Sequence, residues 1–243
     1  MRTKIHDTTI HYIQYGNEQG KDYVLLHGWG QNIEMMKMLG DPFQKEYHIT
    51  ILDLPGFGES EEPNYVWSVF DYVEYLHAFL ESLSIKKPII VGHSFGGKLA
   101  LLYASMYPVE KLVLLAPTFK KSTKDTSMKT KVLKTLKKVP GLNKLESFAK
   151  KHIGSTDYRN ASVTMRQILT KHIQTDIQEE CKKIKCPSLI IWGTKDEAVP
   201  YSNAKELENL ISDAGVVTYE GCTHYAYLER LDQTIQVLKS FYQ

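Results

Sequence analysis

The chain is poor in cysteine, because its 243 residues include only Cys181, Cys186 and Cys222. A small, odd number of cysteines argues against a disulfide framework and indicates a reducing compartment, so we expect a cytoplasmic protein. Cys181 and Cys186 are too few to bind a metal ion without histidine partners nearby. We therefore expect no metal site, and no motif implies a nucleotide, flavin or other cofactor.

Long apolar segments are also lacking. The first ten residues, MRTKIHDTTI, contain no apolar stretch of the kind found in secretory signals, and no run is long enough to cross a bilayer. The formal charge is only +2, which does not favour nucleic acid as a partner of the whole chain. The hydrophobic content of 42% suits a globular domain, so we expect a folded protein with no transmembrane segment.

Short apolar strands alternate with helical patterns along most of the chain. We expect strands at 3–6, 9–15, 23–26, 49–52, 89–91, 112–115, 188–192 and 216–219. We expect helices at 69–83, 98–106, 203–211 and 228–241. This alternation predicts an α/β fold with a mostly parallel sheet flanked by helices, in which ligands bind at the carboxyl ends of the strands.

Residues 118–185 interrupt this alternation, because they contain no convincing strand. Apolar residues follow helical spacing between 132 and 139 and again between 165 and 173. We therefore predict a core domain formed by 1–117 and 186–243, with 118–185 inserted as a helical lid over the site.

The stretch VGHSFGG, residues 91–97, places Ser94 between Gly92 and Gly96. A Gly-x-Ser-x-Gly turn between a strand and a helix is a nucleophile elbow, in which close packing leaves room only for glycine on both sides. A plain glycine-flanked turn is the alternative interpretation. The strand before the motif and the helix after it favour a catalytic serine.

A serine hydroxyl needs a neighbouring base to become a good nucleophile. His224 follows a late strand in the segment GCTH, and Asp196 follows the preceding strand in WGTKD. We expect Ser94 to attack, His224 to transfer the proton and Asp196 to orient the imidazole. Asp53 and Glu197 are weaker candidates for the acid.

An oxyanion hole requires two preorganised donors. We expect the backbone N–H groups of Phe95 and Trp29 to be these donors. Phe95 follows the nucleophile, and Trp29 lies in the loop after the strand at 23–26. Of the nearby histidines, we expect His93 to pack beneath the elbow and His27 to hydrogen-bond the backbone of its own loop.

Five motifs together resemble the α/β-hydrolase fold family, and they span nearly the whole chain except the insertion. They are HGWG at 27–30, DLPGFGES at 53–60, GHSFGG at 92–97, WGTKD at 192–196 and GCTH at 221–224. The resemblance implies a serine carboxylesterase that works through an acyl-enzyme intermediate. The loop HGWGQN at 27–32 is similar to that of the carboxylesterases that act on pimeloyl-acyl carrier protein methyl ester, although tryptophan usually occupies the position of His93 in those enzymes.

The insertion is strongly basic. Between Lys120 and Lys151 there are eleven lysines and two acidic residues, a formal charge of +9, so the remainder of the chain carries −7. A solvated helical face is the ordinary interpretation. A more specific hypothesis is that the insertion is a docking surface for an acidic carrier protein. An anionic membrane is the second partner that its charge would suit. The docking residues would be Lys131, Lys134, Lys137 and Lys138.

The same fold and triad also serve other reactions. The resemblance admits C–C bond hydrolases, a lyase of menaquinone synthesis, cofactor-free haloperoxidases and slow-turnover ligand receptors. Haloalkane dehalogenases and related epoxide hydrolases are disfavoured, because they use aspartate where this chain has Ser94. Ordinary multiple turnover of esters would separate the esterase from the receptor.

Overall fold

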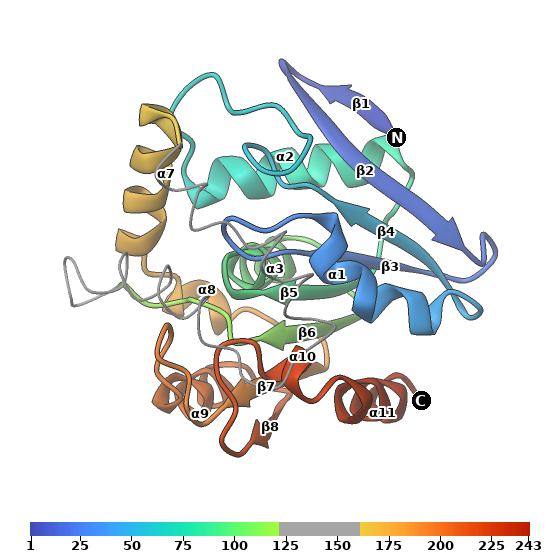
Figure 1. Ribbon diagram of the computed structural model, residues 1–243, viewed down its shortest axis with the longest axis vertical. Helices are drawn as coiled ribbons and strands as arrows, with labels where there is room; N and C mark the ends of the chain where they lie inside the picture. The colour runs from blue at the N-terminus through green and yellow to red at the C-terminus, as the bar shows by residue number, and fades with distance from the viewer. Residues whose placement is uncertain (122–160) are drawn as a thin grey trace.

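Eight strands form one sheet in the order β1-β2-β4-β3-β5-β6-β7-β8 (Figure 1) in the computed structural model, which describes residues 1–121 and 161–243. The strands are β1 (Arg2–Ile5), β2 (Thr8–Gly16), β3 (Lys21–Leu26), β4 (Tyr47–Leu52), β5 (Ile89–His93), β6 (Lys111–Leu115), β7 (Ser188–Gly193) and β8 (Ala214–Tyr219). β2 pairs antiparallel with β1 and β4, whereas all other pairs are parallel. The expected amino-terminal hairpin and mostly parallel sheet are therefore confirmed.

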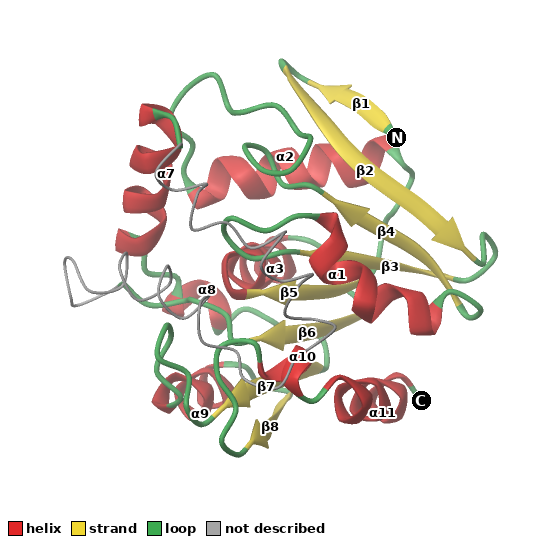
Figure 2. Ribbon diagram, in the orientation of Figure 1, coloured by secondary structure: helices red, strands yellow, loops and turns green. Residues whose placement is uncertain are grey.

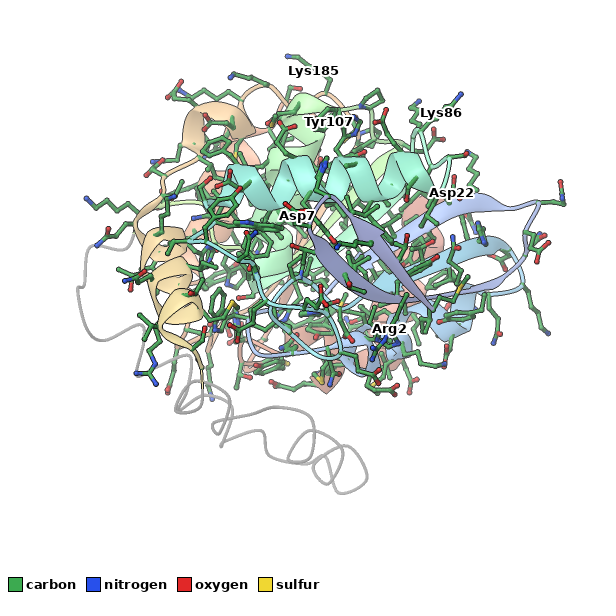
Figure 3. All side chains as sticks on the ribbon, turned by 90° about the horizontal axis from the view of Figure 1, so that it is seen from above. Arg2, Asp7, Asp22, Lys86, Tyr107 and Lys185 are labelled. Carbon is green, nitrogen blue, oxygen red and sulfur yellow. The ribbon has the colours of Figure 1, made fainter. Side chains whose placement is uncertain are left out.

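Helices cover both faces of the sheet, which explains why its central strands are apolar throughout. One core cluster lies beneath α2 (Val69–Ser82), α3 (Ser94–Met106) and α9 (Ser202–Leu210). A second cluster lies beneath α1 (Ile33–Gly40), α10 (Ala226–Glu229) and α11 (Leu231–Tyr242). Lys86, which follows α2, and Tyr107, which follows α3, lie on the same side of the molecule (Figure 3).

Two helical segments differ from the sequence-based expectation. The sequence pattern did not predict α1 or the 3₁₀ turn η1 (Asp41–Phe43), although the Asn32 side chain caps α1 by accepting from the Glu34 N–H. The single helix expected at 228–241 is divided into α10 and α11. The division falls at Arg230, whose backbone leaves helical geometry with φ −124° and ψ 46°.

The strand order creates a topological switch point at the carboxyl ends of β3 and β5. β3 pairs with β4 on one side and with β5 on the other, so the connections that leave β3 and β5 run to opposite sides. Such a switch point is the usual ligand site of an open α/β sheet. The loop that carries Trp29 follows β3, and Ser94 follows β5, so both lie at this switch point.

The described part of the segment between β6 and β7 contains two helices and no strand. Its helices are α7 (Val163–Gln174), which confirms the helix expected at 165–173, and the short α8 (Gln178–Cys181). Arrowheads of β4 and β6 point toward the side on which α7 lies (Figure 2). The helical pattern at 132–139 lies outside the described residues, and so do the four lysines proposed for docking.

Candidate active site

Ser94 occupies a tight corner between β5 and α3. Its φ is +51°, in the left-handed region that ordinary residues rarely adopt, and it is the first residue of α3. A side chain at Gly92 would meet the Gly96 carbonyl oxygen at 2.5 Å, and one at Gly96 would collide with the carbonyls of Leu26 and His27. The backbone therefore has the geometry of a nucleophile elbow.

Asp196 and His224 meet after the neighbouring strands β7 and β8. The Nδ1 atom of His224 lies 2.7 Å from Oδ2 of Asp196, and both side chains are buried. The other oxygen of Asp196, Oδ1, accepts the backbone N–H groups of Ala198 and Val199, each at 2.8 Å. These donors fix the carboxylate, and the pairing leaves Nε2 of His224 available for proton transfer.

The histidine loop is joined to the elbow by His93, the residue before Ser94. The rings of His93 and His224 are 4.8 Å apart, and Nε2 of His93 lies 3.2 Å from the His224 carbonyl oxygen. A backbone hydrogen bond of 2.8 Å from Lys195 to Cys222 joins the Asp196 and His224 loops. The fold thus pairs Asp196 with His224 and holds the His224 loop against His93, the residue that precedes Ser94.

The two N–H groups expected to bind an oxyanion lie on adjacent segments. The N–H of Gly96 donates to the His27 carbonyl over 3.1 Å, which joins the start of α3 to the loop of Trp29. Within the part of the chain that the structure describes, neither the Phe95 N–H nor the Trp29 N–H has a hydrogen-bond partner. Unpaired N–H groups at these two positions are what the expected oxyanion role requires.

Gln31 supports this loop, a role that sequence reasoning missed. Its buried Oε1 accepts the Gly28 N–H at 2.8 Å and lies 3.2 Å from Nδ1 of His93. Its Nε2 donates to the Tyr225 hydroxyl over 3.3 Å. Burial holds the pKa of His93 well below its usual range, so the ring is neutral and has one N–H to donate. Only the position of Gln31 within HGWGQN could have drawn attention to it.

A cluster of aromatic rings packs beside the elbow. Trp29 packs edge-to-face on Phe57 and Phe95, with ring centroids 4.8 and 5.3 Å apart. His172, on α7, lies 4.7 Å from the Phe95 ring and parallel to Trp29 at 6.3 Å. The sequence placed His172 on a helix but assigned it no contact with the site.

The other candidates have separate structural roles. Asp53 contacts His11, with Oδ2 2.7 Å from Nδ1, and also accepts the N–H groups of Ile33 and Glu59. Glu197 is exposed, unlike its neighbour Asp196.

His27 hydrogen-bonds the Gly28 carbonyl from Nδ1 at 2.7 Å, as expected, and its Nε2 also accepts the Leu54 N–H. Across residues 1–121 and 161–243, no cluster of three His, Cys, Asp or Glu side chains is arranged to hold a metal ion. All three cysteines are free thiols. None of the helices described there is long and apolar enough to span a membrane.

Comparisons with known proteins agree with this architecture. Lipase 1 of Psychrobacter immobilis is 27% identical over 95% of this chain and 79% of its own length. Monoacylglycerol lipase ABHD6 of Bos taurus is 27% identical over 90% of this chain and 74% of its own. The crystal structure of the enol-lactonase from Burkholderia xenovorans LB400 superposes with a TM-score of 0.87 at 18% identity, covering 100% of this chain and 99% of that one.

Two family profiles match the chain. One, described as TAP-like protein, matches residues 155–241, and the other, described as alpha/beta hydrolase fold, matches residues 24–165. The second match covers more than half of the sequence. The chain therefore belongs to the α/β-hydrolase fold family.

Proposed function

We propose that the protein is a serine hydrolase of carboxylic esters. Ser94 attacks the ester carbonyl, and His224 takes its proton through Nε2 and then delivers it to the leaving alcohol. Asp196 holds the imidazole tautomer and stabilises the imidazolium. The N–H groups of Phe95 and Trp29 bind the negatively charged oxygen of the tetrahedral intermediate. Water then releases the acyl group from Ser94 by the same steps.

The observation that carries this proposal is the buried contact between His224 and Asp196. Two backbone N–H groups hold one oxygen of the Asp196 carboxylate in place, which fixes the direction of the other oxygen. That oxygen then favours a proton on Nδ1 of His224, which leaves the lone pair on Nε2 for the serine proton. A buried histidine without a carboxylate beside it would lack a fixed ring orientation. No negative charge would then compensate the positive charge that develops when the imidazole takes the serine proton.

The apolar surroundings favour substrates with an apolar acyl group. The rings of Trp29, Phe57 and Phe95 form one wall beside Ser94, and they offer no charged group to a substrate. Proteins named lipase and monoacylglycerol lipase are among the relatives that support this choice. We propose esters of aliphatic acids as the substrate class.

A narrower proposal concerns acyl groups carried by acidic carrier proteins, including carrier-linked methyl esters. Its support is the charge of +9 between Lys120 and Lys151. Reversing the charge of Lys131, Lys134, Lys137 and Lys138 would then raise KM for a carrier-bound ester and leave a small ester unaffected. An equal loss on both substrates would contradict docking. The helical lid at 118–185, which would contain these residues, remains part of this proposal.

The first experiment is hydrolysis of p-nitrophenyl esters from acetate to laurate, comparing wild type with Ser94→Ala. We expect multiple turnover by the wild type and a loss of about 10⁴-fold or more in kcat for the variant. Ser105→Ala is the matched control, because Ser105 lies on the same helix and its hydroxyl donates to the Leu102 carbonyl. No turnover of any ester would contradict the proposal and favour the C–C hydrolase, lyase or receptor alternatives.

A further inference from the structure

A lysine is fully buried one helical turn after Ser94. Lys98 lies on α3 with 0% of its surface exposed, although lysine is almost never fully buried unless its charge is compensated. Within the described residues, no carboxylate forms an ion pair with it. Packing alone does not explain a lysine at this position. A leucine or methionine would fill the same volume without the free-energy cost of removing an amino group from water.

The amino group of Lys98 instead holds the carboxyl-terminal end of α7. Its Nζ donates to the carbonyl oxygens of His172 and Thr175 over 3.0 and 2.6 Å. These belong to the last turn and the C-cap of α7, where carbonyls lack intrahelical partners and the helix dipole is negative. The lysine therefore ties the helix that follows Ser94 to the helix that borders the site.

The two hydrogen bonds to the end of α7 are the main interaction of the Lys98 amino group, and the titratable groups around it do not replace them. Burial lowers its pKa to about 7, and the carboxylate of Asp176 and the thiol of Cys181 partly oppose that shift. His172 is held neutral by burial and by the neighbouring lysine, which keep its pKa well below the usual range. Charged or neutral, the amino group has enough N–H bonds to serve both carbonyls.

The end of α7 that Lys98 holds also carries His172 into the site. The His172 ring contacts Phe95 and lies parallel to Trp29, the two residues whose N–H groups are proposed to bind the oxyanion. Its Nε2 lies 3.4 Å from the Thr118 hydroxyl, and the Thr118 N–H donates to the Ser94 carbonyl at 3.4 Å. The Nδ1 atom of His172 is buried and has no hydrogen-bond partner among the described residues.

We propose that Lys98 is a positioning residue, which seats His172 on Trp29 and Phe95 and thereby fixes the two oxyanion donors; this rests on the proposed ester hydrolysis. Displacing the end of α7 removes the ring that packs against both donor residues. Donors that are not held in place stabilise the transition state less, because part of their interaction free energy is used to orient them. Lys98 itself touches no substrate.

The kinetic test compares Lys98→Met, His172→Ala and the double variant on p-nitrophenyl butyrate. We expect each single change to lower kcat at least tenfold with little change in KM, and the double variant to be no worse than either. That pattern would show that both residues act through one arrangement. Lys183→Met, an exposed lysine near α8, is the control and should leave kcat unchanged. An unchanged kcat in Lys98→Met, a rise in KM alone, or multiplicative losses would overturn the proposal.

Amide hydrogen exchange provides a readout that needs no turnover. In Lys98→Met, we expect the amides of α7 and of Gly96, whose N–H bonds the His27 carbonyl, to exchange at least tenfold faster than in wild type. The Lys183→Met control should match wild type. Unchanged protection in a folded Lys98→Met protein would overturn the positioning role. Faster exchange in a protein that hydrolyses no ester would uphold that role and reject the proposed reaction instead.

Discussion

The backbone N–H of Gly96 donates to the carbonyl oxygen of His27 over 3.1 Å. This one bond connects the segment that carries Ser94 and Phe95 with the loop that carries Trp29. A serine and two N–H donors on separate segments need such a connection, because an oxyanion hole works only when its donors are fixed relative to the attacked carbon. The elbow and the loop thus behave as one unit.

Gly96→Ala should disrupt that unit. Its added methyl group would collide with the carbonyl oxygens of Leu26 and His27, which are backbone atoms and cannot turn away. We expect the free energy of unfolding to fall by about 2 kcal/mol or more, measured by urea denaturation. Gly215→Ala in β8 is the control, since nothing lies within 4 Å of its added methyl group. Equal stability of the two variants would refute the close approach described at the elbow.

Asp196→Asn should abolish activity without unfolding the loop. The amide oxygen of asparagine can still accept the N–H groups of Ala198 and Val199, so we expect thermal stability to change little. Its NH₂ group would face Nδ1 of His224 and drive the proton onto Nε2, which lowers kcat by about 10⁴-fold. The exposed neighbour variant Glu197→Gln should keep full activity. Retained kcat in Asp196→Asn would exclude Asp196 as the orienting acid.

Gln31→Met tests the support beneath the loop that carries Trp29. Methionine has a similar length but accepts hydrogen bonds only weakly, so the buried Gly28 N–H would lose its partner. We expect a loss of about 1–3 kcal/mol in the free energy of unfolding and a lower kcat. Gln44→Met, at an exposed position, should change neither quantity. A stable Gln31→Met protein with unchanged kcat would show that the loop is held by its other contacts.

Lys98 should make stability depend on pH. The unfolded chain keeps this proton up to the ordinary lysine pKa of 10.5, whereas the folded protein releases it near pH 7. The unfolded state therefore binds more protons between these values, and stability rises with pH by up to about 1.4 kcal/mol per pH unit. Urea denaturation at several pH values between 7 and 9 should show this rise in wild type relative to Lys98→Met. Parallel curves for the two proteins would mean that Lys98 titrates normally.

Much of the site follows from short sequence patterns. The apolar runs that became β3, β5, β6 and β7 are continuous because these strands are buried on both faces. Glycine on both sides of Ser94 reflects a local steric requirement, so the elbow could be recognised from seven residues. The order of Ser94, Asp196 and His224 at strand ends was visible because parallel strands end at a common edge.

The supporting residues could not be found in this way. Gln31 and Tyr225 are 194 positions apart and Lys98 and His172 are 74 apart, so no local pattern relates either pair. The division of the last helix at Arg230 is likewise not visible in the sequence, since the apolar spacing runs across it.

The sequence by itself determined the eight strands, most of the helices between them, the elbow and the identity of the residues proposed for catalysis, because these depend on neighbours a few positions away. Only the tertiary structure decided that Asp53 contacts His11 while Asp196 contacts His224. It alone buried Lys98 beneath the end of α7. The physical reason is that burial and hydrogen-bond partners are set when distant segments pack, and packing selects among side chains that look alike in the sequence.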